Sequence, residues 1–163
     1  MTDVNLCKMT KAMARQYYRG FQMDPILFSD PSECVPYVYS NERADAYFDK
    51  QIRLCREYFA IMVNSVPVGE IILKNLDFDN RCCSLSIHLQ NDSVKGKGYG
   101  TTAEILALEY AFYELGLDTV YADTVLHNHR SQRVLKKAGF VQTHSDDRFR
   151  YYRCDRDQWH KPA

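Results

Sequence analysis

The 163-residue sequence lacks the features that mark several specialised classes of protein. No apolar run approaches the ~20 residues that span a bilayer, so we predict no membrane contact. The first residues, 1–5, lack the charged start and apolar core of a secretion signal, and we therefore expect a cytoplasmic protein. A formal net charge of +0 offers no basic surface for nucleic acid. Without repeats or a low-complexity linker, residues 1–163 are predicted to form a single domain.

The six cysteines contain no C-x-x-C pair, so their spacing fits no zinc template. Without a secretion signal, reduced thiols are expected. Cys82 and Cys83 are adjacent in an expected strand, which directs them to opposite faces and favours packing over redox chemistry. His127 and His129 have no third ligand nearby in the sequence. No metal site is predicted.

Alternating and helical patterns of apolar residues predict a mixed sheet with helices on its faces. The expected strands cover residues 4–9, 58–63, 66–73, 81–89, 119–126, a segment led by Phe140, and 149–154. The expected helices cover residues 11–22, 42–57, 101–115 and 129–137, with Thr10, Asn41 and Asn128 as caps. The fold class is α/β (α+β), with about seven strands that are mostly antiparallel. The tail from Trp159 is expected to be loosely held.

Three of the seven glycines gather in residues 94–101, V-K-G-K-G-Y-G-T, between a strand and the strongest helical pattern. Glycines let backbone N–H groups approach a bound anion, and the following helix adds its positive dipole end. We predict a site for a phosphate or diphosphate. A loop that binds a nucleoside triphosphate would need to finish with Gly-Lys-Ser or Gly-Lys-Thr, which is absent. A dinucleotide loop needs G-x-G-x-x-G at the first turn of a parallel unit, whereas this loop follows an antiparallel meander. Coenzyme A fits better.

This loop resembles the acetyl-CoA signature of the GNAT superfamily of N-acetyltransferases, [Q/R]-x-x-G-x-[G/A]. Lys95 stands in the Gln/Arg place, and Gly98 and Gly100 stand in the glycine places. Residues 128–140, N-H-R-S-Q-R-V-L-K-K-A-G-F, resemble the family's Asn-led helix. The two motifs occur in the family's order and at its separation. The resemblance covers essentially the whole chain and is nearest to the branch of ribosomal-protein N-terminal acetyltransferases.

The resemblance implies a GNAT-like fold and a site for acetyl-CoA, the acetyl donor. The strand before the loop would bind pantetheine through its backbone, the loop N–H groups would hold the diphosphate, and Asn128 would bind the pantetheine arm. Lys95 and Lys97 would contact phosphate, although a solvated pair of charges is the alternative. The implied donor-site residues are Ile87, His88, Leu89, Lys95, Gly96, Lys97, Gly98, Tyr99, Gly100, Thr101, Asn128 and Ser131.

The implied chemistry is attack of a neutral amine on a thioester, which needs a base, an oxyanion donor and an acid for the departing thiolate. Many family members use a tyrosine seven residues after the Asn as the acid, but Leu135 occupies that place here. Ser131 is the substitute candidate. For the base, Glu70 is the first candidate, His88 the second and Asp123 the third. A backbone N–H near Leu89 would stabilise the oxyanion.

The acceptor is expected to be a primary amine of a small molecule or a protein N-terminus. Acidic residues could line its approach and favour a cation: Asp24, Asp30, Glu33 and Glu70. The aromatic loop, residues 24–40, is the expected place for acceptor recognition, or else a packed surface loop. A homodimer is expected from the resemblance. The alternative function is a non-catalytic acyl-CoA-binding module of the same fold, favoured by the missing tyrosine.

Overall fold

A computed structural model describes residues 2–163 as one seven-stranded sheet in the order β1-β2-β3-β4-β5-β7-β6. The strands are β1 (Val4–Lys8), β2 (Glu57–Val63), β3 (Val66–Asp77), β4 (Cys82–Leu89), β5 (Thr119–Val125), β6 (Val141–Ser145) and β7 (Phe149–Asp155). The β4–β5 pair is parallel, and the other described pairs are antiparallel. This confirms the predicted mixed, mostly antiparallel sheet.

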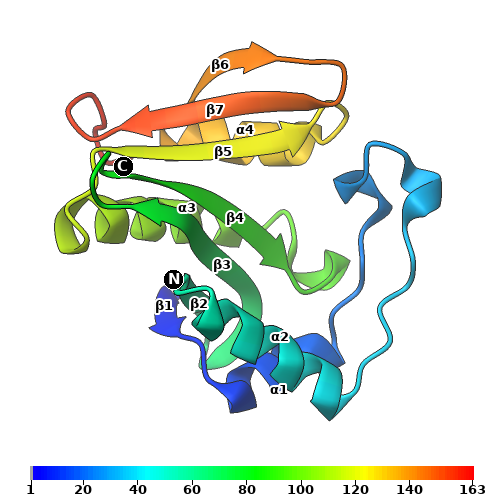
Figure 1. Cartoon of the computed structure of the whole chain (residues 1–163). Coiled ribbons are helices and arrows are strands. Elements are labelled where there is room, and N and C mark those ends of the chain that lie inside the picture. The colour runs from blue at the N-terminus through cyan, green and yellow to red at the C-terminus, as the bar shows by residue number, and fades with distance from the viewer. Residues whose placement is uncertain (1) are drawn as a thin grey trace.

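Helices cover both faces of the sheet, as predicted (Figure 1). They are α1 (Lys11–Arg19), α2 (Asn41–Arg53), α3 (Tyr99–Glu109) and α4 (His129–Ala138). Strand β2 shows why both faces are covered, because its side chains are apolar on each. Phe59, Ile61 and Val63 join the core formed with α3, whereas Tyr58, Ala60 and Met62 join the core formed with α1. Alternation along a strand sends the two sets to opposite faces.

Several predicted boundaries are wrong by a few residues, each for a local reason. Helix α1 ends at Arg19 because Gly20 closes it with bonds from its N–H to the carbonyls of Tyr17 and Tyr18. Ser40, rather than Asn41, caps α2, because its side chain accepts from the N–H of Arg43. At the other end, α2 stops at Arg53, because Cys55 adopts a left-handed φ of 53° and strand β2 begins at Glu57.

Two further elements have bounds that differ from those that the sequence pattern predicted. Strand β3 continues to Asp77 through an irregular register between Lys74 and Asp77, where Asn75 has a φ of 53°. Helix α3 begins at Tyr99 and passes into one π-helical turn, η4 (Tyr110–Glu114).

The prediction of a loosely held tail is wrong at Trp159. Its side chain is 7% exposed, and its Nε1–H donates to the carbonyl of Ala138 over 2.9 Å. Its ring also packs near that of Phe112. The C-terminal segment is therefore fastened to the end of α4.

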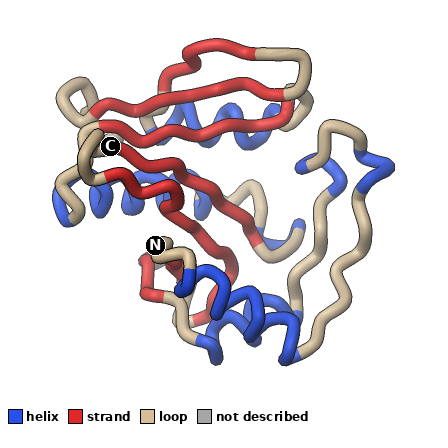
Figure 2. Tube along the Cα trace, in the orientation of Figure 1, coloured by secondary structure: helices blue, strands red, loops and turns tan. Residues whose placement is uncertain are grey.

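Strands β4 and β5 separate along their length, and this separation positions the site. They pair from Cys82 to Ser84 against Thr119 to Tyr121, and no further pairing is described. Beyond that point, β5 remains paired with β7 and β4 remains paired with β3, so the two strands diverge (Figure 2). The end of β4 therefore carries backbone groups that have no strand partner on the β5 side, next to the starts of α3 and α4.

Candidate active site

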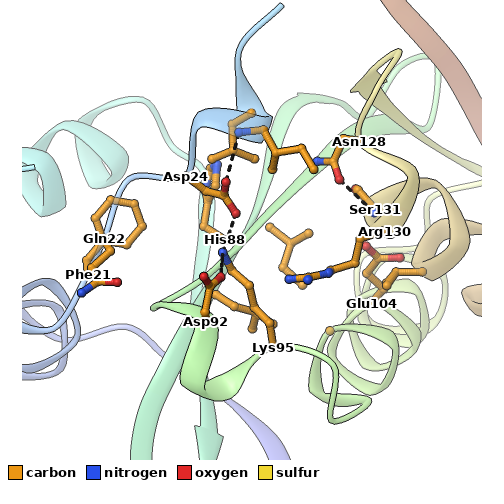
Figure 3. Close-up of a pocket in the computed structure, with 16 residues that line it drawn as sticks. Phe21, Gln22, Asp24, His88, Asp92, Lys95, Glu104, Asn128, Arg130 and Ser131 are labelled. Atoms are coloured by element: carbon orange, nitrogen blue, oxygen red, sulfur yellow. Dashed lines mark hydrogen bonds and ion pairs between the residues drawn. The ribbon is translucent and has the colours of Figure 1, made fainter. Parts of the chain in front are cut away.

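A cavity of about 320 Å³ lies where β4 and β5 diverge. Its walls come from the end of β4, the starts of α3 and α4, and the segment that follows α1 (Figure 3). The lining residues are Phe21, Gln22, Asp24, Ile26, Leu27, Ile87, His88, Leu89, Asp92, Lys95, Gly100, Glu104, Asn128, Arg130, Ser131 and Val134. The structure thus brings together the two motifs that the sequence analysis singled out.

The glycine loop leaves the start of α3 open. Gly96 and Gly98 have φ values of 74° and 84°, a left-handed conformation that glycine adopts without strain. Gly98 precedes α3 as its cap and offers no side chain to the first helical N–H groups. These groups and the helix dipole form a surface that suits an anion. Gly96, Lys97 and Gly98 are exposed and do not line the cavity described above.

Gly100 has a different role from the two glycines before it. It is buried on the first turn of α3, and a Cβ atom there would lie 3.7 Å from Cγ1 of Val134 and 3.9 Å from Cδ1 of Ile87. The first turn of α3 therefore lies close to both α4 and β4. Tyr99 and Thr101, on either side of it, are half-buried.

Lys95 faces two carboxylates. Its Nζ atom lies 2.7 Å from Oδ2 of Asp24 and 3.1 Å from Oδ1 of Asp92, and its side chain is 13% exposed. Burial acts to raise the pKa of Asp24, but the hydrogen bonds from Lys95 and from the N–H of Ile26 together hold that pKa below its ordinary value. The phosphate contact predicted for Lys95 remains a prediction, and in this structure the ammonium group pairs with Asp24.

Glu70 and His88 are register partners on β3 and β4, but they stand in different environments. The Glu70 side chain is 2% exposed and accepts hydrogen bonds from Oη of Tyr18 at 2.7 Å and Oη of Tyr58 at 2.6 Å. Burial and the charge of Glu70 raise the pKa of both tyrosines, so both remain proton donors. His88 is 34% exposed and lines the cavity, whereas Glu70 does not. Accessibility from the cavity favours His88 over Glu70, and the role of each as a base stays a prediction.

The start of α4 presents a serine to the cavity. Asn128 is buried and caps the helix, as predicted, because its Oδ1 atom accepts from the N–H of Ser131 at 3.1 Å. Ser131 itself is half-buried and lines the cavity. Leu135 is 2% exposed in the core, so the place of the family tyrosine holds a packing residue. Asp123, the third predicted base, is exposed on β5 and does not line the cavity.

The predicted acidic approach is only partly assembled. Of the four acids, Asp24 alone lines the cavity described here. Asp30 is exposed and accepts from the N–H of Ser32 at 3.0 Å, so it caps a short turn, η2 (Pro31–Glu33). The first residues of the aromatic loop, up to η1 (Pro25–Leu27), form part of the cavity wall. Beyond η1 the loop extends away from the sheet (Figure 1).

Three charged residues of the cavity, Asp92, Glu104 and Arg130, were missed by the sequence analysis. Arg130 lies between His129 and Ser131 in the Asn-led motif, at a position that the motif leaves unspecified. Glu104 is fully buried, neither carboxyl oxygen has a hydrogen-bond partner, and burial raises its pKa well above the ordinary value. The helical spacing of the sequence does indicate that Glu104 is buried. Ala107 and Leu108 follow it by three and four residues, which puts all three on the apolar side of the helix.

A family model described as "Acetyltransferase (GNAT) domain" matches residues 7–141. The chain belongs to the GNAT acetyltransferase family. It is accordingly an acyltransferase with acetyl-CoA as its donor, and the starts of α3 and α4 around the cavity are the parts that carry the family motifs. This family-level match does not place the chain in the branch of ribosomal-protein N-terminal acetyltransferases. No curated protein sequence matches this chain.

Solved structures share the fold at low sequence identity. A spermidine N-acetyltransferase from Vibrio cholerae, in complex with CoA and spermine, is 16% identical with a TM-score of 0.77, over 95% of this chain and 96% of that one. The N-acetyltransferase PseH of Campylobacter jejuni, in complex with acetyl coenzyme A, is 20% identical with a TM-score of 0.62, over 71% and 79% of the two chains.

Within residues 2–163, no helix is long and apolar enough to cross a membrane. The same residues contain no group of three or more His, Cys, Asp or Glu side chains arranged to hold a metal ion.

Proposed function

We propose that this enzyme transfers the acetyl group of acetyl-CoA directly to a primary amine of a small molecule or a protein N-terminus. One observation carries the proposal. The gap between β4 and β5 holds a cavity that joins the uncapped start of α3 to His88 and Ser131. An anion site and a candidate base and acid would therefore share one cavity.

The donor would bind with its diphosphate at the start of α3 and its pantetheine arm along the end of β4. The loop N–H groups from Gly96 to Thr101 and the dipole of α3 favour the diphosphate. Lys95 and Arg130 add positive charge at the cavity. Ile87, His88 and Leu89 offer backbone groups without a strand partner on the β5 side, and Asn128 and Ser131 face them from α4.

His88 is the better placed base. Imidazole accepts a proton near neutral pH, and this side chain is accessible from the cavity. It would take a proton from the acceptor's ammonium group, directly or through water. The neutral amine nitrogen then bonds to the thioester carbonyl carbon, the C–S bond breaks, and the sulfur leaves with a proton. Ser131 Oγ would donate that proton and regain one from the nitrogen, which loses its second proton as the amide forms. The N–H near Leu89 would bind the oxyanion.

Glu70 would act behind His88 rather than on the substrate. Two tyrosine hydroxyls hold its carboxylate, and Oε1 lies 3.5 Å from Nδ1 of His88. A carboxylate in that position stabilises the imidazolium that forms on proton transfer. Asp24, at the cavity edge, favours a cationic acceptor.

The proposal includes two kinds of acceptor amine. The similarity to a spermidine N-acetyltransferase supports including polyamines, and the resemblance to the ribosomal-protein branch supports including peptide N-termini. A homodimer or larger assembly is also proposed, because one solved structure of the spermidine enzyme is dodecameric. Size-exclusion chromatography with light scattering measures the assembly. A cytoplasmic location remains a prediction from the sequence.

The test of function combines binding with turnover. Isothermal titration calorimetry with CoA should show saturable binding, and release of free thiol from acetyl-CoA should depend on an amine drawn from a panel of polyamines, amino sugars and peptides with free N-termini. Absence of CoA binding at millimolar concentration would overturn the proposal. Binding without turnover across the panel would support the non-catalytic module instead, in line with Leu135 at the tyrosine place.

A further inference from the structure

Glu104 on α3 is a buried carboxyl group without a partner. Its side chain is 0% exposed, and neither Oε1 nor Oε2 makes a hydrogen bond within the described part of the chain, residues 2–163. Buried polar groups in folded proteins almost always have partners, because an unpaired one loses its hydration without compensation. The buried neighbours on its helix, which include Ala103, Ala107 and Leu108, offer no polar side chain. The fold therefore leaves this group unsatisfied.

The burial of Glu104 without a partner favours the protonated form of its carboxyl group. Burial alone raises its pKa well above the ordinary value, and no cation among residues 2–163 lies within ion-pair distance of it. A protonated carboxyl group has one O–H donor and retains acceptor capacity. It also carries no negative charge that would repel a diphosphate at the start of the same helix.

Glu104 belongs to the wall of the cavity on the donor side. It follows Gly100 by one helical turn, which places it about 6 Å further along the axis of α3 from the anion site. Figure 3 draws its carboxyl group on the α4 side of the cavity, beside the labels of Arg130 and Ser131. His88 and Glu70, the groups assigned to the acceptor's proton, belong to β4 and β3.

Resting on the proposed function, we propose that Glu104 is a donor-specificity residue whose carboxylic acid O–H donates a hydrogen bond to an oxygen of the pantetheine arm. The ligand would supply the partner that the protein lacks. The arm carries amide carbonyl and hydroxyl oxygens between its diphosphate and its sulfur, so an acceptor is available along its whole length. A carboxyl group one turn beyond the diphosphate site is placed for the part of the arm nearest the diphosphate.

The experiment compares two ligands and three variants by isothermal titration calorimetry. CoA carries the pantetheine arm, and adenosine 3′,5′-bisphosphate lacks it. Glu104→Leu keeps the volume but removes the donor, and Glu104→Gln keeps an N–H donor. Glu109→Gln, on the same helix but outside the cavity and paired with Lys161, is the matched control.

Glu104→Leu should weaken CoA binding about fivefold and leave bisphosphate binding within about twofold, as loss of one net hydrogen bond requires. Glu104→Gln and the Glu109 control should both bind CoA within about threefold of the wild type. Glu104→Leu should also raise the thermal midpoint by roughly 2 to 4 °C, because it removes an unsatisfied polar group. Opposite effects on stability and on CoA affinity are not expected of a residue that only supports the fold.

The outcomes separate this proposal from the function on which it rests. Equal CoA affinity for the wild type and Glu104→Leu would overturn the role of Glu104 and leave the donor site intact. Equal weakening of CoA and bisphosphate binding would also overturn it, because the effect would not depend on the arm. A wild type that does not bind CoA would overturn the donor site itself, and this proposal with it.

Discussion

Nδ1 of His88 lies 3.5 Å from Oε1 of Glu70, across the neighbouring strands β3 and β4. The carboxylate is fixed from the other side by Tyr18 and Tyr58, so its position does not depend on the histidine. With Nδ1 on the Glu70 side, Nε2 is the ring nitrogen left for the cavity. The pair resembles the arrangement in which a buried carboxylate orients a catalytic imidazole.

This arrangement predicts unequal effects of substitution. His88→Gln should lower kcat/KM about 100-fold, the scale of a lost general base. Glu70→Gln should lower it about 10-fold, because the imidazole loses the carboxylate that orients it. Asp123→Asn, outside the cavity, should have no effect. A large loss from Glu70→Gln alongside an unchanged His88→Gln would instead make Glu70 the base.

The ion pair between Lys95 and Asp24 predicts competition for the donor. Lys95→Met should weaken CoA binding about tenfold through loss of a charge-assisted contact to phosphate. Asp24→Asn should tighten it about threefold, since Lys95 is then free of its nearest carboxylate. Asparagine keeps the oxygen that accepts from Ile26, so the short turn η1 stays capped.

Asp30→Asn is the matched control for that measurement, because Asp30 caps η2 and does not line the cavity. Calorimetry at low and moderate salt should show the Asp24→Asn gain shrink as salt rises. If Asp24→Asn weakens CoA binding as much as Lys95→Met does, Lys95 holds the loop in place rather than the phosphate.

The local features that were predicted correctly from sequence are those that short-range backbone chemistry determines. The helix caps at Thr10 and Asn128 each depend on residues within one helical turn. Their residue types are demanded by local geometry, so a single sequence reveals them. The sheet was predictable for a similar reason, because most strands show an alternating or continuous apolar run of strand length.

The parts that were missed depend on contacts between distant residues. Lys95 and Asp24 are 71 positions apart, and nothing in either neighbourhood indicates that they meet. Glu70 is buried beneath two tyrosines because α1 and β2 pack on β3. Trp159 is fixed by a hydrogen bond to a carbonyl 21 positions away. Burial and pairing of this kind are decided by tertiary packing, which one sequence without periodic repetition does not specify.

Glu104 predicts an unusual dependence of stability on pH. Its pKa is raised in the folded state, so the folded protein retains a proton that the unfolded chain releases above its ordinary pKa of about 4.3. Rising pH therefore destabilises the wild type until the pH passes the folded-state pKa. Glu104→Gln does not titrate. The difference in unfolding free energy, Gln variant minus wild type, should be flat below about pH 4 and then grow by up to about 1.4 kcal/mol per pH unit.

Urea denaturation of both proteins from pH 4 to pH 8 measures that difference. Other groups with shifted pKa values, such as Asp24 and Asp155, are present in both proteins and cancel to first order. The contributions of the other charged and titratable groups of the cavity cancel from the difference in the same way; these groups are His88, Lys95, Asp92 and Arg130. A difference that stays constant across this range would show that Glu104 ionises normally in the folded protein.

The contact between Trp159 and Gly139 predicts strong coupling between the tail and the end of α4. Trp159→Ala should cost about 3 to 5 kcal/mol by removing a buried ring and its bond to Ala138. Gly139→Ala should also destabilise, because its φ is 112° and the new Cβ would lie 2.6 Å from Cδ1 of Trp159.

Combining the two substitutions separates the causes of the Gly139→Ala loss. Removing the Trp159 ring eliminates the clash but leaves the left-handed backbone. The double variant should therefore be more stable than the sum of the single losses implies, with a coupling of at least about 1 kcal/mol. Urea denaturation of the four proteins at one pH provides the cycle. Strict additivity would mean that backbone strain alone accounts for the Gly139→Ala loss, and that the ring of Trp159 moves aside without cost.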